Sequence, residues 1–134
     1  MTDQRLTVAL SIRQPWCWAI LFAGKDIENR NWPTDYRGRV LIHAAKTLVQ
    51  SDYVDAAYFI EGLIKQSIHV PPSSSITRGG IIGEVEIVDC VTQSNSPWFF
   101  GRYGFVLRKA RPLQFQPCKG KLGFFTPELT EAGQ

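Results

Sequence analysis

The sequence predicts an α+β protein that is mainly β: a small mixed β-barrel flanked by two helices and a short C-terminal helical turn. The 134 residues suffice for one compact core but not for two ordinary domains, so residues 1–134 are expected to form a single domain. Short alternating segments bounded by glycine, proline and serine predict several strands around that core. Only two segments show helical spacing, so the repeated strand–helix alternation of a doubly wound sheet is absent.

The N-terminal part predicts a strand, a short helix and a second strand. Residues 7–12 alternate as a strand. Pro15 suits the first turn of the following helix, because its missing N–H would have no partner there. Gly24 is the expected left-handed stop of that helix. Residues 25–32 then alternate again, which places Glu28 and Arg30 on one strand face.

This first helix and its flanking strands hold the best candidate site. An Arg-Gln pair and two tryptophans stand at the end of the first strand, and a Lys-Asp-x-Glu-x-Arg set follows the helix. We expect these side chains to converge around the helix: Arg13, Gln14, Trp16, Lys25, Glu28 and Arg30.

The middle of the chain predicts a strand and a second helix. Residues 39–45 form a strand with His43 on one face, where a histidine is more often part of a wall than a catalytic base. Lys46 follows at the strand's end, where a cation can reach into a groove. Residues 51–66 repeat apolar side chains at three- and four-residue steps, which indicates a packing helix.

Residues 79–91 predict a long strand that carries Glu84 and Glu86 on one face. Two carboxylates spaced by two residues usually form a solvated strand face. The adjacent Gly83 allows close approach of a backbone or a ligand, so Glu84 also stays a candidate site residue.

The C-terminal third is basic and aromatic. Residues 90–127 contain six basic and no acidic residues, a charge of +6 against +3 for the whole chain, so the remainder carries −3. Cations interleaved with aromatic rings suit a single-stranded nucleic acid. Most of these rings also fit a half-buried strand and the barrel interior. Trp98 is the best binding candidate, because Ser96 and Pro97 mark a loop.

Several classes of protein are disfavoured. No apolar run is long enough to span a bilayer and the N-terminus lacks the apolar region of a signal peptide, so we expect no membrane association and a cytoplasmic location. Cys17, Cys90 and Cys118 are widely spaced and are expected to be free thiols, with no metal and no cofactor. The common nucleotide-binding, hydrolase and zincin motifs are missing.

Three motifs occur in a recognisable order: S-x-R-Q-P-W from Ser11, G-K-x-x-E-x-R from Gly24 and R-G-R-V-L-I-H-A-A-K from Arg37. Together they resemble the ASCH domain, a branch of the PUA-like β-barrel superfamily, over residues 8 to about 125. The resemblance implies a PUA-like barrel. It also implies either a nucleic-acid binder or, as in one branch, an N4-acetylcytidine amidohydrolase.

The first functional hypothesis is a binding module for single-stranded RNA or DNA, or for a modified nucleoside. Trp16 or Trp32 would stack on a base, Arg13 and Arg30 would supply forked donors, and Glu28 would accept from an exocyclic amine. Lys25 and Lys46 would add positive charge. Trp16 as a core residue, and Arg30 as a structural partner of Glu28, are the competing interpretations.

The second hypothesis is an amidohydrolase with Lys25, Glu28 and Glu84 as its catalytic residues. The resemblance to the hydrolytic branch places that branch's lysine on Lys25 and its glutamate on Glu84 or Glu86. The branch's threonine falls on Glu28, so a hydroxyl is replaced by a carboxylate. Acidic neighbours are expected to hold Lys25 in its charged form, which opposes a basic role.

A third possibility is a ribonuclease. His43 or Lys46 would act with Glu84, or a divalent metal would use Asp26, Glu28 and Glu84. The spacing favours neither scheme and leaves the oligomeric state open.

Overall fold

The computed structural model describes residues 7–65 and 67–129. Six strands form one sheet in the order β2-β5-β4-β3-β1-β6. Their bounds are β1 Val8–Ile12, β2 Ile27–Arg30, β3 Gly38–Ala44, β4 Gly80–Val91, β5 Tyr103–Pro117 and β6 Phe124–Phe125, and the helices are α1 Trp16–Phe22 and α2 Gln50–Ile64. Strands β1 and β3 are parallel and the other neighbours are antiparallel, so the sheet is mixed.

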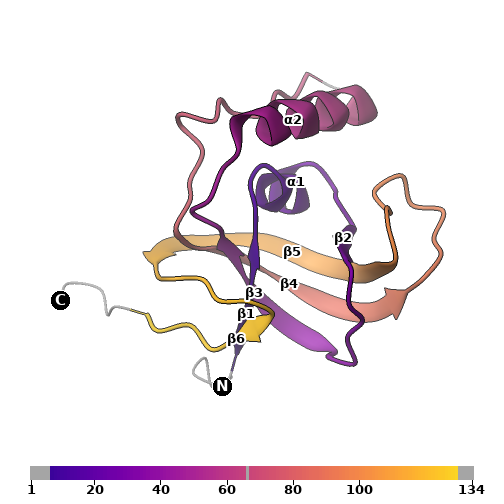
Figure 1. Ribbon diagram of the computed structural model, residues 1–134, viewed down its shortest axis with the longest axis vertical. Helices are drawn as coiled ribbons and strands as arrows, with labels where there is room; N and C mark the ends of the chain where they lie inside the picture. The colour runs from indigo at the N-terminus through magenta and orange to yellow at the C-terminus, as the bar shows by residue number, and fades with distance from the viewer. Residues whose placement is uncertain (1–6, 66, 130–134) are drawn as a thin grey trace.

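The sheet curls into a half-barrel with α1 packed on one face, and α2 lies on the far side of α1 (Figure 1). This arrangement confirms the predicted α+β, mainly β fold with two flanking helices. None of the helices in the described ranges is long and apolar enough to cross a membrane.

Apolar burial explains this layering. The main core lies between α1 and the sheet and includes Ile20, Ile42 and Phe105. A second cluster joins α1 to α2 through Ala19 and Ile60. A third occupies the opposite face of the sheet, with these members: Ala9, Leu41, Ile81 and Phe125. Strands β1 and β3 therefore have apolar side chains buried on both faces.

Local signals set most element boundaries correctly. Gly24 has a φ of +74° just after α1, as expected for a left-handed stop. Pro15 stands at the N-cap of α1, one residue before the first turn in which it was predicted. Residues 126–129 are irregular, and the rest of the predicted C-terminal helical turn lies outside the described residues.

Candidate nucleic-acid interface

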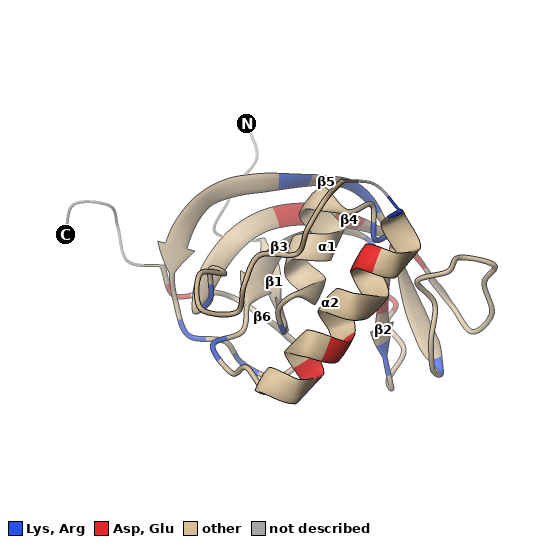
Figure 2. Cartoon of the chain, turned by 90° about the horizontal axis from the view of Figure 1, so that it is seen from above, with Lys and Arg blue, Asp and Glu red and all other residues tan. Residues whose placement is uncertain are grey.

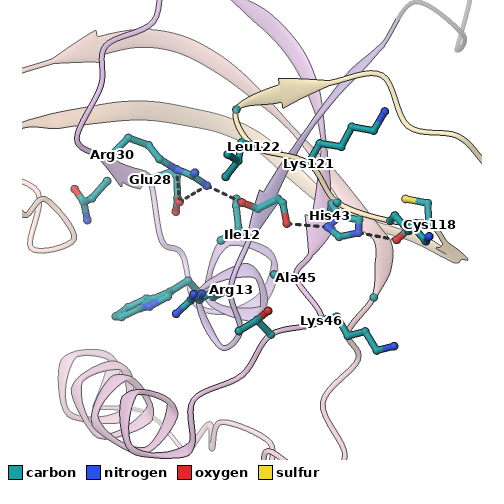
Figure 3. A pocket seen from close by; sticks show the side chains of 18 of the residues that line it. Ile12, Arg13, Glu28, Arg30, His43, Ala45, Lys46, Cys118, Lys121 and Leu122 are labelled. Atoms are coloured by element: carbon teal, nitrogen blue, oxygen red, sulfur yellow. Dashed lines mark hydrogen bonds and ion pairs between the residues drawn. The ribbon is translucent and has the colours of Figure 1, made fainter.

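An open cleft of about 1370 Å³ lies between the ends of β1 and β3, strand β2 and the segment after β5 (Figure 3). Five basic residues line it: Arg13, Arg30, Lys46, Lys119 and Lys121. The first three come from the predicted site, and the last two come from the basic C-terminal third. The fold therefore brings cations from both ends of the chain to one surface.

A second compartment of about 600 Å³ adjoins the cleft and shares four lining residues with it: Arg13, Trp16, Glu28 and Asn29. Four aromatic side chains are among the residues that line it, so we call it the aromatic compartment: Trp16, Phe59, Trp98 and Phe100. Phe59 of α2 lies with its ring centroid 6.2 Å from that of Trp16, 5.9 Å from Trp98 and 5.4 Å from Phe100. Aromatic rings together with nearby polar groups suit a planar, polar-edged ligand such as a nucleobase.

Lys25 forms the buried floor of this aromatic compartment. The turn at Gly24 directs its side chain inward, and only 4% of the residue is exposed. Its Nζ lies 5.2 Å from the ring centroid of Trp16 and 5.7 Å from that of Trp98, and it donates to the carbonyl of Ile27. The Lys25 amine therefore makes cation–π contacts with both indole rings.

Burial lowers the pKa of Lys25, although Glu28 and Asp26 oppose that shift. The two carboxylates favour the charged form of Lys25, as expected, but they do not offset the loss of hydration. The sequence shows the nearby carboxylates but not the indole rings that remove water from the amine. Loss of hydration outweighs the attraction of the carboxylates.

Glu28 and Arg30 share a strand face, as the alternation predicted. The Nε and Nη2 atoms of Arg30 each lie 3.1 Å from Oε2 of Glu28, and Nη2 also donates to the carbonyl of Ser11 at 2.8 Å. The ion pair therefore joins β2 to β1. Arg30 therefore makes the structural ion pair of the competing interpretation, and it also lines the cleft.

Three further predicted site residues are held in place by hydrogen bonds or by packing: Gln14, Trp32 and Trp98. The amide of Gln14 donates to the carbonyl of Thr77 and accepts from the N–H of Trp18. Trp32 is half-buried, packs edge-on against Phe105 and lines the cleft. Trp98 is 6% exposed, so it is a wall of the aromatic compartment and not an exposed loop residue.

His43 occupies the wall of the cleft. Its Nε2 lies 2.8 Å from the carbonyl oxygen of Cys118, and its Nδ1 lies 2.9 Å from the hydroxyl of Ser11. Because a carbonyl can only accept, Nε2 carries the proton in the neutral ring and the Ser11 hydroxyl donates to Nδ1. Both ring nitrogens are engaged, which agrees with a histidine that ties strands together.

Glu84 is not among the residues that line either compartment. Its carboxylate pairs with Arg39 and Arg111. Burial would raise the pKa of Glu84, but the hydrogen bonds from Arg111 and Arg39 outweigh it and hold the pKa below its ordinary value. The fold therefore brings Glu84 neither into the cleft with His43 nor into the aromatic compartment with Lys25.

Sequence reasoning missed several lining residues. Phe59 and Phe100 complete the aromatic walls, and Lys119, Lys121 and Leu122 form the rim of the cleft. The two lysines were counted in the basic stretch, but nothing local indicates that their segment folds over the end of β1. The described residues contain no group of three or more His, Cys, Asp or Glu that could hold a metal ion.

The curled sheet, the two helices and the cleft beside α1 define a small domain of PUA-like architecture, and residues 10–109 match the ASCH domain family. The chain therefore belongs to the ASCH domain family. It is similar to activating signal cointegrator 1 of Homo sapiens and of Mus musculus, with 28% identity over 85 residues in each case. Those 85 residues are 63% of this chain and 14% of each relative, so the match spans a small part of the relatives' length.

Proposed function

We propose that this domain binds single-stranded RNA or DNA, or a modified nucleoside, along the cleft beside α1. One observation carries the proposal: five basic residues line an open cleft that adjoins an aromatic compartment of about 600 Å³. Cations on a groove neutralise phosphates, while flat aromatic side chains stack on bases of any sequence.

Each part of the ligand has a matching surface in this proposal. The phosphates follow Arg13, Lys46 and the lysines at the rim. A base enters the aromatic compartment beside Trp16. There Lys25 Nζ and Glu28 Oε1 lie 4.0 Å apart, so a donor and an acceptor stand side by side for the polar edge of a base.

A salt titration of oligonucleotide binding tests the proposal. If about five phosphates are neutralised, the logarithm of the association constant falls with the logarithm of salt concentration at a slope of about −3.5. A flat titration, or no binding at about 50 mM salt, contradicts a polyanion ligand. A parallel NMR titration with cytidine and N4-acetylcytidine locates the base subsite, with shifts expected at Trp16, Lys25 and Phe59.

Hydrolysis of an N4-acylated cytidine is the second candidate function. The lowered pKa of Lys25 in a compartment of nucleobase size favours it, because an amine that releases its proton more readily can act as a base. Two features oppose it. Glu28 stands where the hydrolytic branch has a hydroxyl, and the carboxylate of Glu84 is paired with arginines away from the compartment.

We therefore expect N4-acetylcytidine to bind without appreciable turnover. The assay is release of acetate from N4-acetylcytidine by the wild type, with Lys25→Ala as the control. Turnover at an ordinary enzymatic rate that Lys25→Ala abolishes contradicts a pure binding module and establishes the hydrolase.

A further inference from the structure

Leu122 is an unusual residue for the rim of a cationic cleft. It is 99% exposed, the highest exposure of the large apolar side chains in the described ranges. It lies in residues 118–123, a short segment between β5 and β6 that we call the arch. Figure 3 shows its side chain extending from the arch toward the cleft, on the side of Ile12 and Arg30.

The base of the arch is held in place. The N–H of Cys118 donates to the carbonyl of Gly79 at 3.2 Å, and the carbonyl of Cys118 accepts from His43. A Cβ at Gly120 would come within 2.7 Å of the His43 ring and 2.9 Å of the Ser11 hydroxyl, so the arch backbone presses directly on these two side chains. Gly123, with a φ of +66°, turns the chain into β6. Leu122 thus stands on an anchored support.

The surroundings of Leu122 indicate what would cover it. Lys119 and Lys121 precede it on the arch, and three further cations line the same cleft: Arg13, Arg30 and Lys46. A partner for this apolar tip must combine an apolar face with negative charges close by. A nucleic-acid strand meets both requirements at every nucleotide, because each base has an apolar face and is followed by a phosphate.

We propose that Leu122 is a wedge that inserts between two neighbouring bases of a bound single strand, while Lys119 and Lys121 hold the adjacent phosphates. This inference rests on the proposed function and adds an unstacking step to it. Leucine is among the apolar side chains that proteins place between base steps. Separating two bases at the rim would leave one of them free to enter the aromatic compartment.

The test uses a single-stranded oligonucleotide with two adjacent 2-aminopurines, whose fluorescence is quenched while they stack on each other. Saturating wild-type protein is expected to raise the fluorescence. Leu122→Ala is expected to lose this increase and to bind about fivefold to tenfold more weakly. Its salt slope should stay unchanged, because no charge is removed.

Three variants serve as controls. Leu122→Met keeps the apolar bulk and is expected to retain the fluorescence increase. Val88→Ala truncates another exposed aliphatic side chain, outside the lining of both compartments, and should have no effect. Lys121→Ala should reduce the magnitude of the salt slope by about 0.7 and keep the fluorescence increase at saturation.

The possible failures are distinguishable. If the wild type does not bind the oligonucleotide, the proposed function fails. If the wild type binds but Leu122→Ala behaves like Val88→Ala, the wedge is wrong and the cleft proposal stands. If Leu122→Ala instead reduces binding to vesicles of anionic phospholipid and leaves oligonucleotide binding intact, the apolar tip serves a membrane surface and the wedge is overturned.

Discussion

At the scale of single residues, the buried amine of Lys25 is the most chemically distinctive group of the aromatic compartment. Two indole rings and a backbone carbonyl surround it, and its pKa is lowered. The unfolded chain therefore holds this proton more tightly than the folded protein does. It follows that the free energy of unfolding rises with pH between the folded pKa of Lys25 and its ordinary value of about 10.

Substitution of Lys25 by methionine tests this linkage. We expect Lys25→Met to be close to the wild type in stability at pH 7, because a buried charge is replaced by apolar bulk of similar length. Between pH 7 and about pH 10 the wild type should gain stability relative to the variant, by about 1.4 kcal/mol for each unit by which the pKa is lowered. Chemical denaturation across this range measures the difference. A difference that stays constant with pH would show that Lys25 titrates as it does in the unfolded chain.

Arg13 and Arg30 both line the cleft but differ in their other contacts. Arg13 is exposed, whereas Arg30 bonds to Glu28 and to the Ser11 carbonyl. We expect Arg13→Ala to weaken oligonucleotide binding by about 1 kcal/mol and to leave the stability within about 0.5 kcal/mol. Arg30→Ala should lower the stability as well, by about 1 to 3 kcal/mol.

The matched control for these arginines is Arg102→Ala, which removes an exposed arginine outside the lining of both compartments. Binding should be measured by fluorescence anisotropy and stability by thermal melting. Equal loss of binding in Arg13→Ala and Arg102→Ala would mean that the cleft is not the interface.

At the scale of the elements, Glu84 ties three adjacent strands together. Its carboxylate on β4 pairs with Arg39 of β3 and Arg111 of β5. A similar pair joins Lys109 to Glu86 at 3.9 Å. Two of the three basic residues of β5 therefore lie beside carboxylates of β4, and both remain exposed to solvent.

We expect Glu84→Gln to destabilise the protein by about 1 to 2 kcal/mol at pH 7, since the exposure of Arg111 limits the strength of its pair. The wild-type carboxylate has a lowered pKa, so its advantage is present above the unfolded pKa and is lost as pH falls through the folded pKa. Denaturation of both proteins between pH 7 and about pH 3 should show the two stabilities converging. Oligonucleotide binding should stay unchanged, and a loss of binding would place Glu84 in the site after all.

The packing of α1 is the second test at this scale. Ile20 is 3% exposed and belongs to the main core between α1 and the sheet. Ile20→Ala should lower the free energy of unfolding by about 2 to 5 kcal/mol, through lost burial and the cavity that remains. The folded fraction should keep its affinity for nucleic acid. A folded variant with reduced affinity would show that the position of α1 sets the shape of the cleft.

At the scale of the whole molecule, the distribution of charge is more informative than its total. Figure 2 shows acidic residues along α2, where Asp52 and Asp55 border the aromatic compartment. The cleft instead collects cations from distant parts of the chain. We expect nucleic-acid affinity to follow the charges of the cleft and not the net charge of +3.

Two double variants distinguish the effect of the cleft charges from the effect of the net charge. One double variant combines Lys119→Ala with Lys121→Ala, and the other combines Arg108→Ala with Lys109→Ala. Each removes two positive charges, but only Lys119 and Lys121 line the cleft. The first double variant should reduce the magnitude of the salt slope by about 1.4, and the second should leave it unchanged. Equal slopes for both would indicate binding through net charge alone.

The sequence by itself determined the fold class, most element boundaries and the family, because these depend on short-range signals. Alternation predicted β1 to β4, and Gly24 marked the end of α1 with the conformation expected of it. It also indicated that Trp16, Lys25, Glu28 and Arg30 converge around one helix, because these positions flank a single strand–helix–strand unit. That they bind a ligand stays a prediction.

Only the tertiary structure decided which charges are available and which are buried. In each case the contact comes from a residue far away in the chain. Trp98 removes water from Lys25, Arg111 holds Glu84 on the sheet, and the arch brings Lys121 and Leu122 over the end of β1. The solvation of a charge depends on everything packed around it, and a local sequence pattern contains only its neighbours along the chain.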